Sequence, residues 1–214
     1  MFASELLKWY DKVKRQLPFR DVDDPYKIWL SEIMLQQTQV ETVIPYYNKW
    51  IKKHPTINSV AEADLTSLLK LWEGLGYYAR CRNLHKAAKI IVKNNSGEIP
   101  KDMEYLRTLP GVGDYTAAAV MSIAFGKPVP VIDGNVKRVM TRVLGMKKLS
   151  HRNLSLVRNR LNTFISKSRP GDFNQALMEL GAKICTPKSP KCTQCPIGFR
   201  CWALTSLTPE AYPT

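Results

Sequence analysis

The most specific chemical signal in the sequence is a group of four cysteines near the end of the chain. They form the pattern Cys-x6-Cys-x2-Cys-x5-Cys at Cys185, Cys192, Cys195 and Cys201. Four thiolates this close in sequence can bind one metal centre. Zinc sites are usually built from two short Cys-x-x-Cys pairs and this run has one, whereas iron–sulfur clusters accept uneven loops. The spacing therefore favours a structural iron–sulfur cluster over zinc, while Cys81 is expected to be a buried thiol.

A carboxylate inside an apolar helix is the second signal. Glu32 lies in Trp29-Leu30-Ser31-Glu32-Ile33-Met34-Leu35, and Ile28 and Leu35 share its face at helical spacing. A carboxyl group buried there would have a raised pKa and could act as a general acid. Because the helix is apolar nearly all round, the pattern also fits a glutamate on the helix surface.

Asp133 stands before Gly134, Asn135 and a predicted helix over residues 136–144. This is the position of a helix N-cap, and most such aspartates do nothing else. A fixed, ionised carboxylate is also what the stabilisation of an oxocarbenium-like sugar requires. Asn135 is placed either to hold this carboxylate or to contact a phosphate.

A predicted hairpin between two helices covers Leu109-Pro110-Gly111-Val112-Gly113-Asp114-Tyr115-Thr116. Pro110 cannot continue the preceding helix, and Gly111 and Gly113 allow a sharp turn. Residues 116–124 then strongly favour a helix. Backbone N–H groups at such a helix N-terminus suit a phosphate oxygen, although the motif alone also fits an ordinary turn.

Two other turns carry amide and aromatic side chains, in Gln36-Gln37-Thr38-Gln39 and in Gly74-Leu75-Gly76-Tyr77-Tyr78-Ala79-Arg80. Such side chains can wedge into a base stack and hold open the gap left by a flipped nucleotide. Both turns equally fit a plain turn with a tyrosine pair in the core. The histidines show no metal or triad spacing and are expected to be structural: His54, His85 and His151.

The elements that position these residues are predicted to be helices throughout. Apolar residues recur at helical spacing and no strand alternation persists, so the fold class is all-α. The expected helices cover residues 4–16, 26–37, 38–54 with a break or kink at Pro45, 64–71, 77–94, 102–108, 116–124, 136–144, 151–167 and 173–184.

Composition narrows the function classes. The 214 residues are 44% hydrophobic, which supports a real core, and their formal net charge of +14 favours a polyanionic partner such as nucleic acid. A solvated lysine surface is the alternative on charge alone. The sequence has neither a signal peptide nor an apolar run long enough to span a membrane, so we expect a cytoplasmic, nucleoid-associated protein.

Taken together, the motifs resemble the helix-hairpin-helix DNA glycosylase superfamily, and within it the MutY-type adenine DNA glycosylases. The resemblance extends over nearly the whole chain. Its specific parts are residues 17–20, where the family usually has Trp at the third place, and residues 31–38, 74–78, 109–115 and 133–136.

The resemblance implies a role for each matching residue. Glu32 would protonate the departing adenine, Asp133 would stabilise the sugar cation, and Tyr115 and Asn135 would support these two. Gln175 would line the base pocket, and Tyr77 with Gln37 would fill the duplex opposite. The other DNA-binding positions implied are Arg20, Gln36, Gly111 and Gly113, and the four C-terminal cysteines would hold a [4Fe–4S] cluster.

The resemblance also implies a two-lobed fold. One lobe, residues 23–131, would be a helical barrel with the hairpin, and residues 1–22 with 132–214 would form a cluster lobe. Double-stranded DNA with a mismatched or oxidised base would lie across the cleft between the lobes, bound by a monomer. The implied activity is hydrolysis of the N-glycosidic bond of adenine paired with guanine or 8-oxoguanine.

Two departures bear on this expectation. Bifunctional relatives of the endonuclease III type carry Lys where this chain has Tyr115, and without that amine no Schiff base forms. MutY proteins usually continue into a NUDIX-like domain that reads oxidised guanine, whereas this sequence ends at Thr214. Recognition of the opposite base therefore stays open.

Two alternatives remain at this point. A thymine or uracil glycosylase acting on guanine mismatches would use the same scaffold, but such relatives lack a glutamate at the place of Glu32. A non-catalytic, iron–sulfur DNA-binding or redox-sensing protein belongs to another class, and the presence of both carboxylates argues against it.

Overall fold

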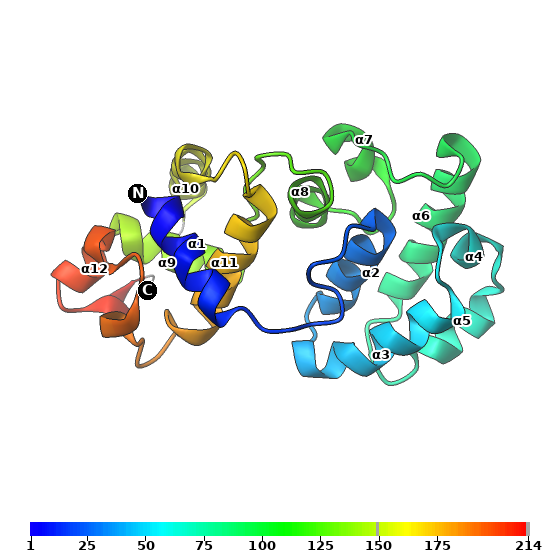
Figure 1. Cartoon of the computed structure of the whole chain (residues 1–214), viewed down its shortest axis with the longest axis horizontal. Helices are drawn as coiled ribbons and strands as arrows, with labels where there is room; N and C mark the ends of the chain where they lie inside the picture. Colours follow the sequence, from blue (N-terminus) through cyan, green and yellow to red (C-terminus); the bar gives the residue numbers. More distant parts are fainter. Residues whose placement is uncertain (149, 213–214) are drawn as a thin grey trace. The chain divides into compact units, whose positions relative to one another are not determined.

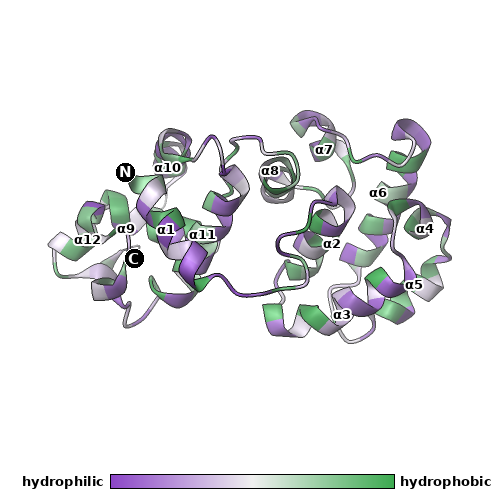
Figure 2. Cartoon of the chain, in the orientation of Figure 1, coloured by the Kyte–Doolittle hydropathy of each residue, from purple (hydrophilic) through white to green (hydrophobic). Residues whose placement is uncertain are grey.

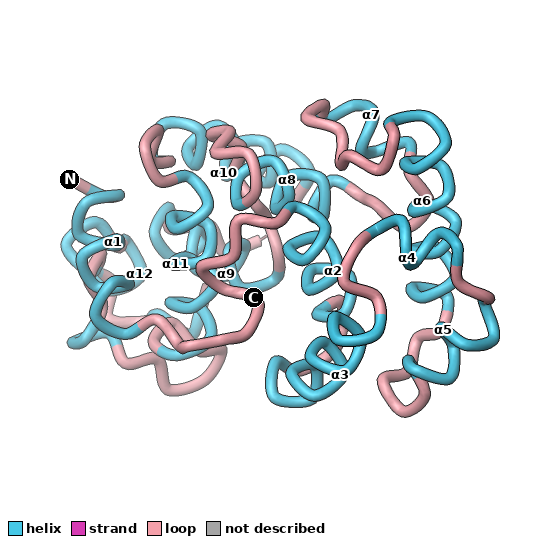
Figure 3. Tube along the Cα trace, turned by 45° about the vertical axis from the view of Figure 1, so that its right-hand side comes forward, coloured by secondary structure: helices cyan, strands magenta, loops and turns pink. Residues whose placement is uncertain are grey.

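The computed structural model describes residues 1–148 and 150–212, and in these ranges no residue lies in a β-strand (Figure 3). The predicted all-α class is confirmed. The chain forms two compact units: unit 1 comprises Met1–Arg15 and Gly126–Thr214, and unit 2 comprises Gln16–Phe125. Leu149, Pro213 and Thr214 of the predicted cluster lobe lie outside the described residues.

Unit 2 is built around helix α2, Pro25–Leu35, which packs against α3, α6 and α8 (Figure 1). Asp24 caps α2 by accepting hydrogen bonds from the backbone N–H groups of Tyr26 and Lys27, and Pro25 occupies the first position. The helix is buried on almost every side from Tyr26 to Met34. The other helices of unit 2 are α3 (Val40–Lys53), α4 (Ile57–Glu62), α5 (Leu65–Trp72), α6 (Ala79–Asn95), α7 (Met103–Thr108) and α8 (Asp114–Ile123).

Unit 1 is centred on α9, Gly134–Leu144, and α11, Pro170–Lys183, with α1, Phe2–Val13, packed on α11. These helices carry both apolar and polar residues (Figure 2), and their apolar faces meet in one core that includes Leu6, Met140 and Leu177. The remaining helices of unit 1 are α10 (His151–Phe164), η1 (Cys192–Gln194), η2 (Gly198–Arg200), α12 (Trp202–Thr205) and η3 (Pro209–Ala211).

Both predicted lobe boundaries shift by a few residues. Residues 16–22 belong to unit 2, where the ring of Phe19 meets that of Tyr47 edge-on at 5.3 Å. Residues 126–131 belong to unit 1, because the Asn174 side chain donates to the Val129 carbonyl at 2.9 Å and accepts from the Val131 N–H at 3.1 Å. These contacts join segments far apart in sequence, so no local pattern announces them.

Several helix limits also differ from the expected ones. α4 was not predicted; Thr56 and Ser59 form a capping box that begins a helix of only six residues. Pro45 does not break α3, because burial of Val43, Tyr47 and Trp50 holds the helix together around it. Among the described residues, no helix is both long and apolar enough to span a membrane.

Candidate active site and metal centre

Glu32 lies in the interior of unit 2, on the middle of α2. The residue is only 7% exposed, so Glu32 is not the surface glutamate that the sequence pattern also allowed. Tyr115, from the first turn of α8, donates its hydroxyl to Glu32 Oε2 at 2.9 Å. One turn further along the chain, Gln36 Nε2 donates to the Thr116 hydroxyl at 3.2 Å. The contact between α2 and α8 thus brings together three of the predicted site residues: Glu32, Gln36 and Tyr115.

Asp133 caps α9, as its sequence context predicted. Its Oδ1 accepts from the Val136 N–H at 2.6 Å, and its Oδ2 accepts from Asn135 Nδ2 at 3.1 Å. One donor is a free N–H of the helix N-terminus and the other is a side chain within the first turn. Both carboxylate oxygens are therefore held in a fixed orientation.

Arg138 extends this arrangement toward the first cysteine. One of its terminal nitrogens donates to Asn135 Oδ1 at 2.9 Å and to the Gly181 carbonyl at 2.7 Å, while Nε donates to the Cys185 carbonyl at 2.8 Å. Burial lowers the pKa of Arg138 from its ordinary value. A continuous series of hydrogen bonds consequently joins the Asp133 carboxylate to the backbone at Cys185.

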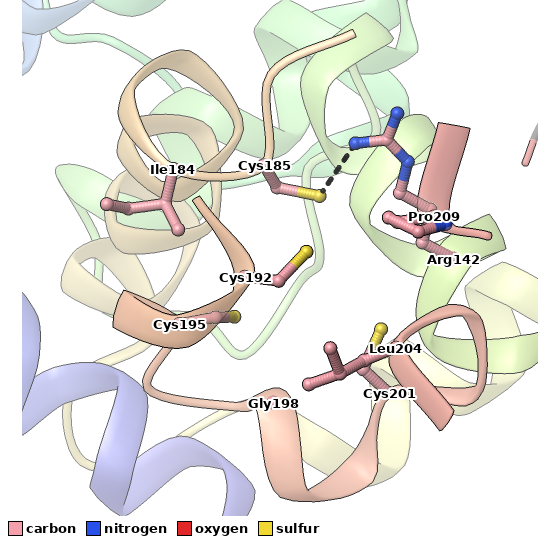
Figure 4. A pocket seen from close by; sticks show the side chains of 9 residues that line it. All are labelled: Arg142, Ile184, Cys185, Cys192, Cys195, Gly198, Cys201, Leu204 and Pro209. Carbon is pink, nitrogen blue, oxygen red and sulfur yellow. Dashed lines mark hydrogen bonds between the residues drawn. The ribbon is translucent and has the colours of Figure 1, made fainter. Parts of the chain in front are cut away.

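The four C-terminal cysteines line one cavity (Figure 4). Cys185 lies shortly after α11, Cys192 begins the short helix η1, Cys195 follows η1, and Cys201 is the N-cap of α12. In the described residues, no three His, Cys, Asp or Glu side chains gather closely enough for a single ion. Four cysteine thiols that line one pocket are the donor set that an iron–sulfur cluster requires.

Arg142, on α9, closes one side of this cavity and is 2% exposed. Its guanidinium donates to Cys185 Sγ at 3.4 Å and to the Thr186 and Pro187 carbonyls at 2.7 and 2.9 Å. A buried cation beside the thiols favours an anionic group in the cavity. Burial raises the pKa of the Cys195 thiol to about 12.

The predicted hairpin is present between α7 and α8. Gly111 has φ +78°, and a Cβ there would meet the Cβ of Asn83 at 2.8 Å, so only glycine fits. Gly113 differs from the expectation, because its φ of −92° suits any residue and an added Cβ would meet no atom within 4 Å. The Gly113 N-cap of α8 makes no side-chain cap hydrogen bond, and open space lies beside it.

Comparison with known proteins decides the family. Residues 30–165 match the HhH-GPD superfamily of base excision DNA repair proteins. The chain belongs to this superfamily. The match covers the Glu32, hairpin and Asp133 regions together.

Curated relatives of this HhH-GPD chain include two adenine DNA glycosylases. The one from Homo sapiens is 47% identical, with 98% of this chain and 40% of the relative covered. The one from Schizosaccharomyces pombe is 44% identical, with 94% and 49% covered. The chain thus spans less than half the length of either relative.

Among solved structures, a thermostable thymine-DNA glycosylase is 30% identical with a TM-score of 0.88, over 96% of this chain and 95% of that one.

The HhH-GPD chain exposes its two predicted wedge residues. Tyr77 is 60% exposed, and Gln37 is also exposed. Both have left-handed backbone conformations, with φ of 49° and 56°, which are uncommon for residues other than glycine. Tyr77 and Gln37 therefore stand on constrained backbone with their side chains toward solvent.

The other predicted residues to place are Gln175, Arg20 and Cys81. Gln175, on α11, accepts from the Tyr10 hydroxyl at 3.3 Å within unit 1. Arg20 lies in a turn of unit 2 after the buried Phe19. Cys81 is fully buried, as expected, and burial raises the pKa of its thiol to about 12.

Sequence reasoning missed three arginines that organise the site: Arg80 and Arg142, which are buried, and Arg138, which is half-buried. Each uses its guanidinium to bind several backbone carbonyls. The sequence held one indication of this role: Arg138 and Arg142 are four residues apart and so lie on one face of α9. Their carbonyl partners come from distant loops and are not visible in the sequence.

Proposed function

We propose that this protein removes adenine paired with guanine or 8-oxoguanine in double-stranded DNA, by hydrolysing the N-glycosidic bond of the flipped nucleotide. The observation that carries the proposal is the buried carboxyl group of Glu32 with the Tyr115 hydroxyl upon it. A carboxyl group removed from bulk water is suited to deliver a proton to a leaving base. The adenine DNA glycosylases that the chain resembles at 47% and 44% identity support adenine as that base.

In the proposed reaction, Glu32 gives its proton to the adenine ring as the C1′–N9 bond breaks. Positive charge develops on the sugar, and the Asp133 carboxylate stabilises it, either electrostatically or covalently. Water then attacks C1′ and releases a proton to solvent, from which Glu32 is reprotonated, and the products are free adenine and an abasic site. Val136 N–H and Asn135 keep the Asp133 oxygens oriented for this role.

We infer that the activity is monofunctional. Strand cleavage through a Schiff base needs an amine at the sugar, and this chain has the Tyr115 hydroxyl at the position where bifunctional relatives carry lysine. The hydroxyl is instead engaged with Glu32. The expected product is an abasic site in an intact strand.

The proposed DNA contacts come from both units, and the protein would act as a monomer associated with the nucleoid. The backbone of the hairpin at Gly111 and Gly113, at the start of α8, would bind phosphate, and Tyr77 with Gln37 would enter the base stack. Gln175 would line the base pocket, with Gln36 and Arg20 as further contacts. The net charge of +14 supplies the long-range attraction and a steep loss of affinity with salt.

The four cysteines that line the cavity would hold a [4Fe–4S] cluster with a structural role. Such a cluster, when bound, fixes the loop between α11 and α12, and Arg142 would neutralise part of its charge. Purified protein should then contain about four iron and four sulfide per chain. Stoichiometric zinc without sulfide would contradict this assignment.

Single-turnover base excision tests the main proposal. The duplexes pair adenine, thymine or uracil with guanine or 8-oxoguanine, and the products are separated before and after alkaline cleavage of abasic sites. Loss of adenine opposite both purines, with strand breakage only after alkali, is the expected result. Breakage without alkali would instead indicate a bifunctional enzyme.

The same assay addresses the second candidate, a thymine or uracil glycosylase. The thymine-DNA glycosylase structure, at 30% identity and TM-score 0.88, favours this candidate. Excision of thymine or uracil but not adenine would establish it. Tight duplex binding without excision of any base would point to a non-catalytic iron–sulfur DNA-binding protein.

A further inference from the structure

Arg80 joins two turns of unit 2 that are far apart in sequence. The residue is 8% exposed and lies in the first turn of α6. One terminal nitrogen of its guanidinium donates to the carbonyls of Ile33, Met34 and Gln36 at 3.2, 2.7 and 2.5 Å. The other donates to the carbonyls of Leu75 and Gly76, both at 3.2 Å. Five backbone acceptors, from the C-terminal end of α2 and from the turn before α6, thus converge on one side chain.

One carbonyl in each of the two sets belongs to the residue just before an exposed residue with a left-handed backbone. Gln37 directly follows Gln36, and Tyr77 directly follows Gly76. The guanidinium carbon also lies 5.3 Å from the centre of the Tyr77 ring, within range of a cation–π contact. Arg80 therefore holds the backbone immediately before both residues while their side chains stay accessible.

We propose that Arg80 is a positioning residue that holds Gln37 and Tyr77 together as one rigid wedge for opening the duplex, an inference that rests on the proposed action upon DNA. Left-handed conformations of non-glycine residues persist only where surrounding contacts determine them. The carbonyls that Arg80 binds are those contacts on both sides. A wedge fixed in advance loses little conformational entropy when it enters the base stack.

Arginine is the residue type that this task requires. Its planar guanidinium presents donors in a fixed fork that can serve two loops at once. Lysine keeps the positive charge, but its single ammonium group cannot span both sets of carbonyls. Arg80→Lys therefore separates the bridging of the two loops from the mere presence of a buried cation.

The primary test measures duplex opening without relying on catalysis. A duplex carries 2-aminopurine opposite guanine, and its fluorescence rises when the base leaves the stack. At saturating protein, Arg80→Lys should give roughly half the wild-type rise or less, because the opened population shifts back to the stacked state. Arg82→Lys, on the exposed side of α6, is the matched control and should behave as wild type. Circular dichroism verifies the fold, and Arg80→Gln replaces the lysine variant if that variant is unfolded.

A companion excision assay excludes an indirect effect on Glu32, whose neighbour Ile33 also contacts Arg80. Arg80→Lys should lower adenine excision opposite guanine by about tenfold to a hundredfold, but by less than about threefold opposite an abasic site, where no pair must be opened. In a Tyr77→Ala background the same substitution should add little.

Equal losses on the two excision substrates, or an unchanged fluorescence rise, would overturn the inference. So would a wild-type protein that opens no duplex. A wild-type protein that opens the duplex but releases no adenine would overturn the proposed function instead, and the fluorescence comparison would still decide the role of Arg80.

Discussion

The two carboxylates to which we assign the chemistry are held in opposite ways by the two units. Glu32 is in the middle of α2, where every backbone N–H is already used within the helix, and its partner is a hydroxyl from another helix, α8. Asp133 is at the start of α9, where the helix itself supplies a free N–H. The environment of Glu32 is thus a product of tertiary packing, whereas that of Asp133 is largely local.

This difference predicts different responses to substitution. A substitution on α8 should change the environment of Glu32 but not the N-cap of α9. A change within the first turns of α9 should reach Asp133 without disturbing α2. The following experiments test that separation, beginning with the largest expected effect.

Glu32→Gln should lower the single-turnover rate of adenine excision by at least about a hundredfold, since the amide keeps the shape but has no acidic proton. Binding to duplex DNA should persist. Glu62→Gln, at an exposed position at the end of α4, is the matched control and should excise normally. A near-normal rate in Glu32→Gln would exclude this residue as the acid and favour the thymine-type candidate.

Asp133 allows the cap and the charge to be separated. Asp133→Asn keeps an N-cap oxygen, so stability should change little while excision falls by about a hundredfold. Asp133→Ala should in addition lose about 1 kcal/mol of unfolding free energy, because the Val136 N–H loses its acceptor. Thermal melts and excision rates on both variants check this. Equal activity in Asp133→Asn and wild type would reduce Asp133 to a structural cap.

Arg138→Lys tests the hydrogen-bond series that ends at Cys185. Lysine keeps the charge but cannot serve Asn135, Gly181 and Cys185 together. We expect about a tenfold loss of excision, the equivalent of roughly 1.4 kcal/mol, through misorientation of Asn135 and Asp133. Arg152→Lys, exposed on α10, is the control. Full activity together with full iron content would show that the series is not needed for orientation.

The sequence allowed the local features to be predicted. Helix composition, the cap at Asp133, the turn at Gly111 and the spacing of the four cysteines each depend on a few neighbouring residues. The superfamily follows from these motifs and is confirmed by the match over residues 30–165. The all-α architecture could also be predicted, because helical periodicity is a local property of the sequence, and the structure confirms it.

Long-range pairings could not be predicted in the same way. The contact of Tyr115 with Glu32 joins residues 83 positions apart, and Arg80 binds carbonyls 44 to 47 positions away. The lobe boundaries were displaced because Asn174 holds residues 129 and 131 in unit 1. Gly113 was expected to supply backbone freedom, but its backbone conformation is one that any residue adopts. Its lack of a side chain instead leaves open space beside the start of α8.

The smallest expected effect is the most direct measure of the tertiary environment of Glu32. Tyr115→Phe removes one hydroxyl and keeps the ring, so the packing of α8 on α2 should remain. The lost hydrogen bond corresponds to about 0.5–1.5 kcal/mol, or roughly a threefold to tenfold slower excision. Tyr105→Phe, on α7 of the same unit, controls for the loss of a tyrosine hydroxyl elsewhere. Because the hydroxyl acts through the carboxyl group, Tyr115→Phe should have little further effect in a Glu32→Gln background. Additive effects in the double variant would mean that Tyr115 contributes by another route, and an unchanged rate in the single variant would show that Glu32 needs no partner from α8.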